Sequence, residues 1–479
     1  MKEDLSNIPG PKGIPFLGSV LSINPAKMHL SFCEWALKYG RIFKVKIFGN
    51  TVVVLNDFDL VRKVFADKEQ IEVFNDRPEM FVGKFALYET SDVILYLDNN
   101  KKFMMLKRIL QKCLKRQSQT YSFRLSFEKE LERLKDHLNH LDGKEIEINP
   151  LIRHSLANVI SILMSGEGLT NEESKRIWEF NDNVLYLLET SVNLILSTFP
   201  FMRFLPGRLG TVFSEMMSSR DWVIDKYFEQ CKLNCKLNSE KGLVYALLAE
   251  QENINNEQGV EVITDENIKG IILDLVVAAM KTTNSAVAAC FLLLLKHPKH
   301  VATIQNEIDE IVGQDRVPDE EDQSNMPFCR AFIYEVLRYI SHGTLGLPHL
   351  ATTDYKLEGY TFSKNDIILS NIWFIHHDPE FWDKPWEFHP QRFLDETGNL
   401  VPADHDNMRR IATFSVGRRV CIGKDIALTR IFLYMTSILQ QFSPLPSEKS
   451  CLPDADPHQY NPGLVLEPNY FSCRLIKRK

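Results

Sequence analysis

The chain has 479 residues, of which 44% are hydrophobic and 25% are charged, a composition typical of a globular protein with a large apolar core. Its net charge of −7 gives no reason to expect a nucleic-acid partner. The nine cysteines are odd in number and lack a regular spacing, which favours a reducing compartment over a disulfide scaffold.

The chain opens with a polar and proline-rich lead-in, residues 1–18. Met1–Ile8 has no apolar signal-peptide core. The next stretch, "PGPKGIPFLG" (Pro9–Gly18), has three prolines and three glycines, which predict a stiff, extended segment. No run reaches about 20 consecutive apolar residues, so we expect no membrane-spanning helix and no N-terminal anchor in this chain.

A β-hairpin and several helices are predicted next. Residues 41–57, "RIFKVKIFGNTVVVLND", alternate in polarity around Gly49-Asn50, which is typical of a hairpin. Lys101–Arg116 predicts a basic amphipathic helix, and Ser126–Leu141 carries mixed charges at helical spacing. Leu185–Leu205 is apolar and is interrupted by a proline.

The strongest helix prediction covers about Asp265–Lys296. Thr264 is a plausible N-cap, two acids occupy the first turn, and Pro298 ends the helix. At 1.5 Å per residue this helix is roughly 48 Å long, enough to cross a whole domain. Its middle is apolar on most faces, which predicts burial.

Further helices are expected over Phe328–Tyr339 and about Asp425–Phe442, with short strands such as "DIILS" (residues 366–370) between them. There are no repeats and no long disordered linker. The sequence therefore predicts one mostly helical domain over residues 1–479, mainly α with small β-sheets near both ends.

One cysteine lies in an unusual setting, the stretch "TFSVGRRVCIGKDIA" that contains Cys421. A packing cysteine would not explain the surrounding glycines and arginines. A nucleophile would need a histidine or cation nearby; Arg418 and Arg419 could serve as cations, but no histidine is close in sequence. A single thiolate without partner ligands also suits an axial ligand to a metal that brings its own equatorial ligands, of which haem is the obvious case.

The neighbours of Cys421 fit the ligand interpretation. Gly417 would allow a tight turn close to the ring, and Gly423 would leave room for backbone amides to point at the sulfur. Phe414 would pack beside the sulfur and exclude water, and Arg419 would pair with a haem propionate. A helix that begins near residue 425 would direct its positive end towards the thiolate.

The segment "FSVGRRVCIG" matches the haem-binding signature F-x-x-G-x-R-x-C-x-G of the cytochrome P450 family, which the chain resembles over almost its whole length. The resemblance implies a triangular helical domain around a buried haem b (heme b, iron protoporphyrin IX). It also implies that Cys421 is the proximal thiolate ligand of the iron.

A second motif concerns structure. "EVLR" contains Glu335 and Arg338 at positions i and i+3, within an apolar and therefore buried helix. In the family such a pair joins an arginine from a later P-x-R-F segment, which "PQRF" supplies as Arg392. We expect a structural network behind the haem.

The long helix contains "AAMKTT", which resembles the family's oxygen-binding segment A-[AG]-x-[DE]-T. Ala278 is small and would allow close approach of a flat cofactor. Thr282 matches the threonine that helps deliver protons to iron-bound oxygen. The alternative for such a threonine is a hydrogen bond to a carbonyl one turn back.

Lys281 departs from this pattern, because it stands where the family has an acid. A carboxylate can relay protons, whereas an ammonium can donate one but alters the local field. Desolvation could lower the pKa of Lys281 enough for a relay, which makes Lys281 a candidate catalytic residue beside Thr282. The substitution also leaves two other functions open: a P450-type isomerase or dehydratase that acts on a lipid hydroperoxide without dioxygen, and a non-catalytic haem-containing lipid binder.

The resemblance assigns further cofactor-binding residues. Arg77 in "NDRPEM" and His349 in "GLPHLATTD" correspond to donors that contact haem propionates. The family's W-x-x-x-R appears as "FMMLK", which puts Phe103 and Lys107 in those places. Lysine keeps the charge of arginine but loses its bidentate geometry.

By resemblance to animal microsomal members, including steroid- and xenobiotic-oxidising ones, we expect a monooxygenase that hydroxylates or epoxidises a steroid, fatty acid or xenobiotic with dioxygen. Its electrons would come from NADPH-cytochrome P450 reductase, with cytochrome b5 as a second donor. The implied location is the cytoplasmic face of the endoplasmic reticulum membrane, as a monomer at the membrane surface. Basic residues on two segments would face an acidic electron donor: Lys101, Lys102, Lys107, Arg108, Lys112, Lys115, Arg116, Arg409, Arg410, Arg418 and Lys424.

Overall fold

The predicted hairpin forms the edge of a four-stranded sheet in the computed structural model, which describes residues 7–87, 97–234 and 241–478. β1 (Ile42–Ile47) pairs antiparallel with β2 (Asn50–Leu55), and the sheet order is β1-β2-β7-β4. The turn is centred on Phe48 and Gly49, one residue earlier than predicted. Both have positive φ, 44° and 82°, which is the two-residue turn that matches strand twist.

The remaining strands are short. In the first sheet, β7 (Ile367–Ser370) confirms the strand predicted from "DIILS", and β4 is His349–Leu350. A second sheet has the order β3-β9-β8, and β5 pairs with β6 alone. These strands are β3 (Glu145–Glu147), β5 (Tyr355–Leu357), β6 (Tyr360–Phe362), β8 (Phe442–Pro446) and β9 (Ser472–Lys477).

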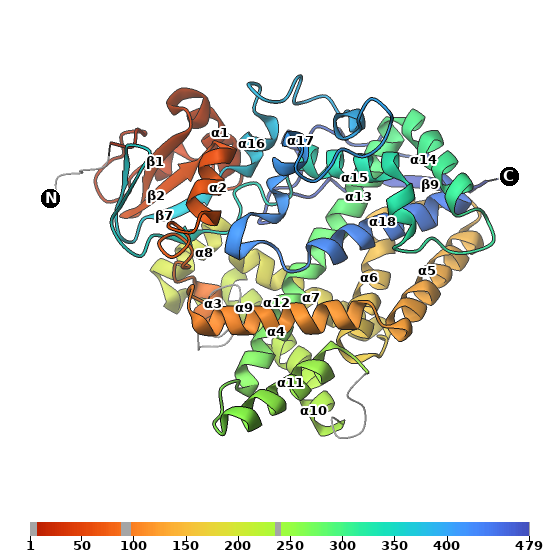
Figure 1. The fold of residues 1–479 in the computed structure, drawn as a ribbon, viewed down its shortest axis with the longest axis horizontal. Coiled ribbons are helices and arrows are strands. Elements are labelled where there is room, and N and C mark those ends of the chain that lie inside the picture. Colours follow the sequence, from red (N-terminus) through yellow and green to blue (C-terminus); the bar gives the residue numbers. More distant parts are fainter. Residues whose placement is uncertain (1–6, 88–96, 235–240, 479) are drawn as a thin grey trace.

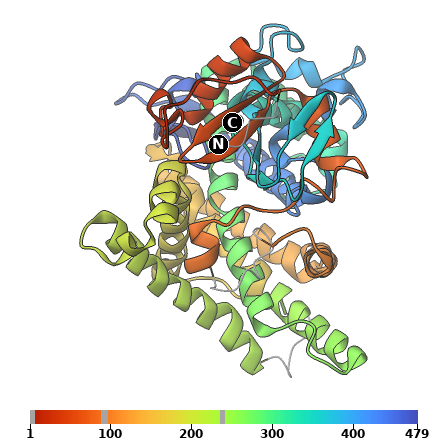
Figure 2. The same ribbon diagram turned by 90° about the vertical axis from the view of Figure 1, so that its left-hand side faces the viewer.

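Helices make up most of the molecule and lie mainly to one side of the first sheet (Figure 1). The basic segment is helical as predicted, in α4 (Lys101–Ser118), and mixed charges line α5 (Tyr121–Leu141). The apolar stretch after residue 185 is divided among the end of α7, α8 and a 3₁₀ turn at Pro200–Phe204. The other helices before residue 260 are α1 (Met28–Tyr39), α2 (Phe58–Ala66), α3 (Phe81–Phe85), α6 (Ile148–Ser165), α7 (Asn171–Leu188), α8 (Thr190–Thr198), α9 (Arg208–Ile224), α10 (Gln230–Asn234) and α11 (Leu243–Gln258). Figure 2 shows α9–α11, in yellow-green and green, on the side opposite the first sheet.

The long central helix is divided in two. α12 (Asp265–Ala279) and α13 (Lys281–Lys296) meet at Met280, whose φ and ψ of −90° and −71° interrupt the helix. The predicted helix is therefore present with both of its ends as predicted, and it is interrupted at this one residue. Thr264 caps the start through a capping box with Asn267, and α14 (Pro298–Ile311) begins at the proline that was expected to end it.

The C-terminal half confirms the other two predicted helices, as α15 (Pro327–Ile340) and α18 (Lys424–Gln441). Two short helices, α16 (Ile372–His377) and α17 (Asp406–Arg409), lie between them. α13 packs against α6, α15 and α18, which places it at the centre of the fold.

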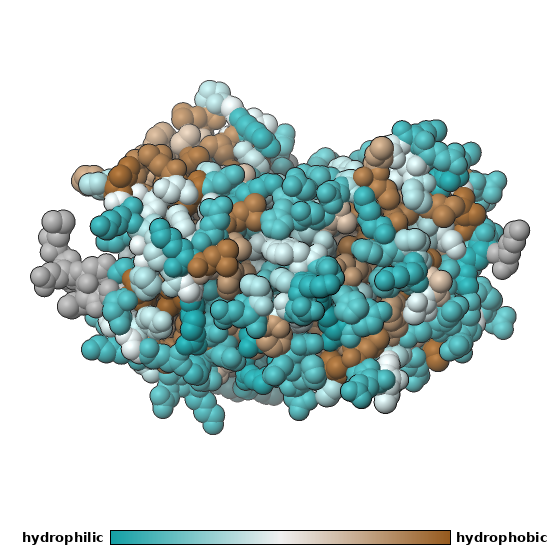
Figure 3. Space-filling model, turned by 90° about the horizontal axis from the view of Figure 1, so that it is seen from above, coloured by the Kyte–Doolittle hydropathy of each residue, from teal (hydrophilic) through white to brown (hydrophobic). Residues whose placement is uncertain are grey.

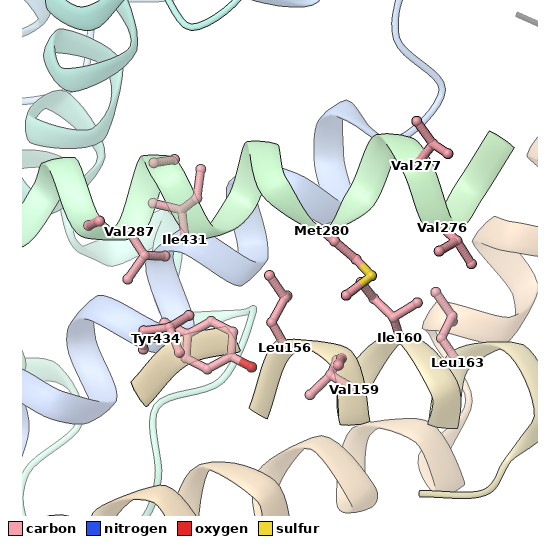
Figure 4. Close-up of a cluster of buried hydrophobic side chains, with 14 of the residues drawn as sticks. Leu156, Val159, Ile160, Leu163, Val276, Val277, Met280, Val287, Ile431 and Tyr434 are labelled. Carbon is pink, nitrogen blue, oxygen red and sulfur yellow. The ribbon is translucent and has the colours of Figure 1, made fainter. Parts of the chain in front are cut away.

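The apolar core surrounds this central helix. Figure 4 shows Met280 directed towards Leu156 and Ile160 of α6, while Val287 lies near Ile431 and Tyr434 of α18. Residues 265–296 are long and apolar enough to cross a membrane, but 72% of their most apolar window is buried inside the protein. We therefore interpret α12 and α13 as core helices, as predicted.

The buried ion pair of α15 is present as expected. Arg338 donates to both carboxylate oxygens of Glu335, at 2.7 and 2.8 Å, and both side chains are fully buried. Arg392, from the 3₁₀ turn Pro390–Phe393, completes the network with its Nε 3.4 Å from Glu335 Oε1. Arg338 also donates to the carbonyls of His376 and Pro385, so the network ties α15 to the segment that precedes Cys421.

We expect Glu335→Gln to lower the free energy of unfolding by about 3–5 kcal/mol, because it leaves two buried guanidinium groups without their carboxylate. Denaturant unfolding measures this. The matched control is Glu387→Gln, which breaks an i,i+3 pair with Lys384 that is about two-thirds exposed, and we expect a change within about 0.5 kcal/mol. Equal losses in the two variants would contradict the assigned role of the network.

Candidate functional site

The segment before α18 holds Cys421 in a fixed loop. The Cys421 N–H donates to the Phe414 carbonyl at 2.9 Å, which closes the loop on itself. Gly417 has φ +70°, and a Cβ there would lie 2.1 Å from the Phe65 carbonyl oxygen. The tight turn expected at Gly417 is confirmed, and its close approach in this structure is to the backbone at the end of α2.

Cys421 is an exposed residue, while most of the described cysteines are buried. Burial by the surrounding protein nevertheless raises the pKa of the Cys421 thiol. The backbone N–H of Gly423, at the start of α18, acts in the opposite direction, as do the ammonium groups of Lys107 and Lys424. These groups favour the thiolate, as the sequence analysis expected from a helix N-terminus at this position.

Two buried cations lie beside the cysteine loop. Lys107 of α4 donates to the Arg418 carbonyl, and burial together with the nearby Arg419 lowers the pKa of Lys107 to about 8. Arg419 donates to the Asn75 carbonyl at 2.8 and 3.0 Å, and its guanidinium lies 3.8 Å from the centre of the Phe103 ring. Burial lowers the pKa of Arg419 to about 10.

Two further basic side chains extend this group. His349 on β4 stacks on Phe65 with ring centres 3.9 Å apart, and its Nδ1 lies 2.8 Å from the Phe74 carbonyl oxygen. Burial lowers the pKa of His349 well below its usual value, and the charges of Arg77 and Arg419 add to this effect. Arg77 donates to the carbonyls of Leu347 and Pro348, at 3.2 and 2.7 Å.

The segment that resembles the family's oxygen-binding segment lies at the break in the central helix. A helix leaves its last four carbonyls without backbone donors, and here side chains satisfy them. Thr282 Oγ1 donates to the Ala278 carbonyl at 2.6 Å, and Thr283 Oγ1 donates to the Ala279 carbonyl at 3.0 Å. Asn181 of α7 donates to the two carbonyls before them, those of Val276 and Val277, both at 3.0 Å. Ala278 is exposed although the helix around it is buried.

Lys281 does not have the lowered pKa that the sequence suggested. Burial alone would lower the pKa of its ammonium, but the charge and hydrogen bond of Glu467 more than offset this, so the pKa of Lys281 is raised. Its Nζ lies 2.9 Å from Glu467 Oε2 and 4.0 Å from Asp182 Oδ1. The expectation failed because both carboxylates are distant in sequence.

The predicted residues therefore form two groups. Cys421, Lys107, Arg419, His349 and Arg77 are linked by contacts or by their influence on one another's charge. Ala278, Lys281 and Thr282 lie together at the helix break. Sequence analysis missed Asn181, Asp182 and Glu467, since no motif marks them and only the fold brings them to the break.

This set of residues fits a haem. A thiol supported by positive groups suits an axial ligand, and an exposed alanine on a buried helix suits a flat ring. The buried donors of Arg77, Lys107 and Arg419 suit anionic propionates. Within the described ranges, no group of three or more His, Cys, Asp or Glu side chains could hold a metal ion.

Comparison with known proteins gives the family. The family model for cytochrome P450 matches residues 8–474. The chain belongs to the cytochrome P450 family. It is 27% identical to cytochrome P450 2D20 of Mesocricetus auratus, over 98% of this chain and 93% of that protein. It is 26% identical to human cytochrome P450 1B1 (98% and 87%) and 28% identical to mouse cytochrome P450 1A2 (97% and 90%).

Family membership confirms the expected fold class and the haem cofactor. This P450 is accordingly an enzyme of a family whose members are typically monooxygenases. The haem would supply the redox chemistry when bound, and the protein would supply a thiolate ligand, the surrounding charges and a site that excludes water.

We expect Gly417→Ala to reduce haem incorporation at least fivefold, because a Cβ cannot fit between this loop and Phe65 and the backbone has positive φ. The ratio of haem absorbance to protein absorbance in the purified enzyme measures this. Gly423→Ala is the matched control, since a Cβ there meets nothing within 4 Å and φ is −89°. Equal haem content in the two variants would contradict this assignment.

Proposed function

We propose that this P450 is a haem-thiolate monooxygenase that hydroxylates or epoxidises a lipophilic small molecule, such as a steroid, fatty acid or xenobiotic. It would use dioxygen and two electrons from a reductase. The observation that carries the proposal is the Cys421 thiol at the start of α18, which the Gly423 N–H and the Lys107 ammonium both favour as a thiolate.

The protein's own groups would act as follows. Cys421 would ligate the iron, and Phe414, which packs on the apolar core, would limit access of water to the sulfur. Arg77, Lys107, His349 and Arg419 would hold the propionates once those displace their present carbonyl acceptors. Thr282 would exchange its bond to the Ala278 carbonyl for a water and so hold a proton donor above the ring.

An acidic electron donor would dock on the α4 side of the cysteine loop. Several cations of α4 are exposed, including Lys101, Arg108 and Lys112, although Lys112 pairs with Glu250 at 2.7 Å. They line a hollow of about 800 Å³ together with Arg418, which directly precedes Arg419, the arginine of the haem signature's R-x-C. NADPH-cytochrome P450 reductase and cytochrome b5 are the donors that the microsomal relatives suggest.

The same relatives suggest the cytoplasmic face of the endoplasmic reticulum membrane. Exposed apolar side chains support contact with a lipid surface, and Figure 3 shows brown atoms gathered at the end of the molecule that carries the first sheet. The exposed residues of the lead-in and hairpin are Ile14, Phe16, Leu17, Leu21 and Phe48, and those around the 3₁₀ turn after α8 are Ile195, Phe199, Phe201, Phe204 and Leu205.

One observation favours a second function, an isomerase that rearranges a lipid hydroperoxide. The residue before Thr282 is Lys281 and not an acid, and the Lys281 ammonium forms an ion pair with Glu467. Turnover of a lipid hydroperoxide without NADPH or reductase would assign this function in place of the first.

The reduced enzyme with bound carbon monoxide should show the red-shifted absorbance band of a thiolate-ligated haem. We expect Cys421→Ser to abolish that band, because an alcohol is not ionised at neutral pH and gives the iron a weaker donor. Cys451→Ser is the matched control, since Cys451 is also exposed but lies outside the loop. A band that survives the loss of the Cys421 sulfur would refute the ligand assignment.

Reduction of the haem by reductase should depend on ionic strength. We expect Arg108→Glu to slow reduction about threefold or more at low salt, and the difference to shrink towards 0.5 M salt, where charge attraction is screened within about 4 Å. Stopped-flow absorbance measures the rate. Lys299→Glu on α14 controls for the change in net charge. A reduction rate that does not vary with salt would count against docking at α4.

A further inference from the structure

The Lys281 side chain takes part in a charge network at the helix break. Its closest carboxylate is Glu467, in the loop that precedes β9, with 2.9 Å between Lys281 Nζ and Glu467 Oε2. Asn149 of α6 donates to the other oxygen of Glu467 at 3.1 Å. Asp182 of α7 lies 4.0 Å from Lys281 and also pairs with Arg153 of α6. Three other parts of the fold, the loop before β9, α6 and α7, therefore take part in the network around Lys281.

Hydrogen bonds that do not involve Lys281 fix the backbone at Glu467. Its N–H and carbonyl both bond to Asn461, at 3.2 and 2.8 Å. The preceding residue, Leu466, receives a hydrogen bond from Ser285 Oγ at 3.0 Å and donates to the His342 carbonyl at 2.9 Å. The carboxylate of Glu467 is thus fixed relative to α13 and is about nine-tenths buried.

Lys281 and Thr282 occupy different faces of α13. Residues four apart lie on one face of a helix, so Lys281 shares the face of Ser285, which bonds to the loop that carries Glu467. Thr282 shares the face of Ala278, the exposed residue of the helix break. A lysine side chain is long enough to bend from one face to the other unless something holds its ammonium.

We propose that Glu467 is a positioning residue of this P450, which holds the Lys281 ammonium on the face of the C-terminal loop and away from Thr282. This inference rests on the proposed haem function. With the ammonium held there, the polar group that the first turn of α13 presents on the face of Ala278 is the neutral hydroxyl of Thr282. Without Glu467, a mobile cation would lie within reach of the waters that Thr282 holds and would change the field at the iron. A lysine at position 281 therefore requires a carboxylate from a distant part of the chain, here Glu467, to keep its ammonium away from Thr282.

The test uses the reduced, haem-loaded enzyme with carbon monoxide, whose infrared stretching frequency responds to nearby charge and needs no turnover. We expect Glu467→Gln to shift or broaden the band, because the released ammonium approaches the ligand. In Glu467→Gln/Lys281→Met the band should return to the wild-type position, since no ammonium remains. Glu229→Gln is the matched control: it breaks the 3.1 Å pair of Glu229 with Lys269 of α12, away from the break, and should leave the band unchanged.

Thermal unfolding of the same variants gives an independent readout. Glu467→Gln and Lys281→Met should each lower the midpoint by about 2–4 °C, and the double variant by no more than the larger single loss, because the two side chains interact directly. In catalysis, Glu467→Gln should lower the product formed per NADPH about threefold, and the double variant should recover it. A merely structural role for Glu467 would lower the midpoint and leave the carbon monoxide band in place.

The proposal is overturned by a wild-type band in Glu467→Gln, by a shift that persists in the double variant, or by an equal shift in Glu229→Gln. If Glu467→Gln does not retain haem, Glu467→Asp is measured instead, because it keeps the charge and withdraws it by one methylene; a smaller shift of the same sign supports the proposal and no shift overturns it. A wild-type enzyme that forms no oxygenated product would refute the monooxygenase function, while the carbon monoxide bands would still decide the role of Glu467.

Discussion

The rest of this structure depends on the constraint that the proposed iron ligation places on Cys421, whose sulfur would have to carry negative charge inside the protein. Burial favours the neutral thiol of Cys421, so the fold has to supply positive groups that oppose it. They come from the start of α18, through the Gly423 N–H, and from Lys107 of α4, which the Arg418 carbonyl holds in place. The close contact of Gly417 with the last residues of α2 fixes the loop between these two sources.

Buried charge is managed in two ways in this fold. Behind the cysteine loop, Glu335, Arg338 and Arg392 form a closed network of opposite charges that can serve only structure. Around the cysteine, Arg77, Lys107 and Arg419 direct donors at neutral carbonyl oxygens. Carbonyls are acceptors that an anionic ligand can replace, because they lose a hydrogen bond and leave no charge unpaired.

The sequence predicted the features that local signals determine. The hairpin, the ends of the central helix, α15 and α18 follow from periodicity and capping residues, and the cysteine loop follows from a dense motif. The errors lie where distant residues decide. Asn181 donates to two carbonyls at the end of α12, where the helix breaks at Met280. Glu467 raises the pKa of Lys281, which burial alone would lower. Neither partner is close to its target in the chain, and neither lies in a recognisable pattern.

The C-terminal segment after residue 446 carries none of the signature residues, yet it completes two parts of the molecule. β9 is the middle strand between β3 and β8, and the loop before it brings Glu467 to the centre of the fold. A product of early termination near residue 450 would still contain every motif by which the family is recognised. It would nevertheless leave two strand edges open to self-association and strip Lys281 of its nearest carboxylate. The presence of the C-terminal segment therefore matters as much as the haem-binding signature when a gene variant is assessed for the ability to encode a folded protein.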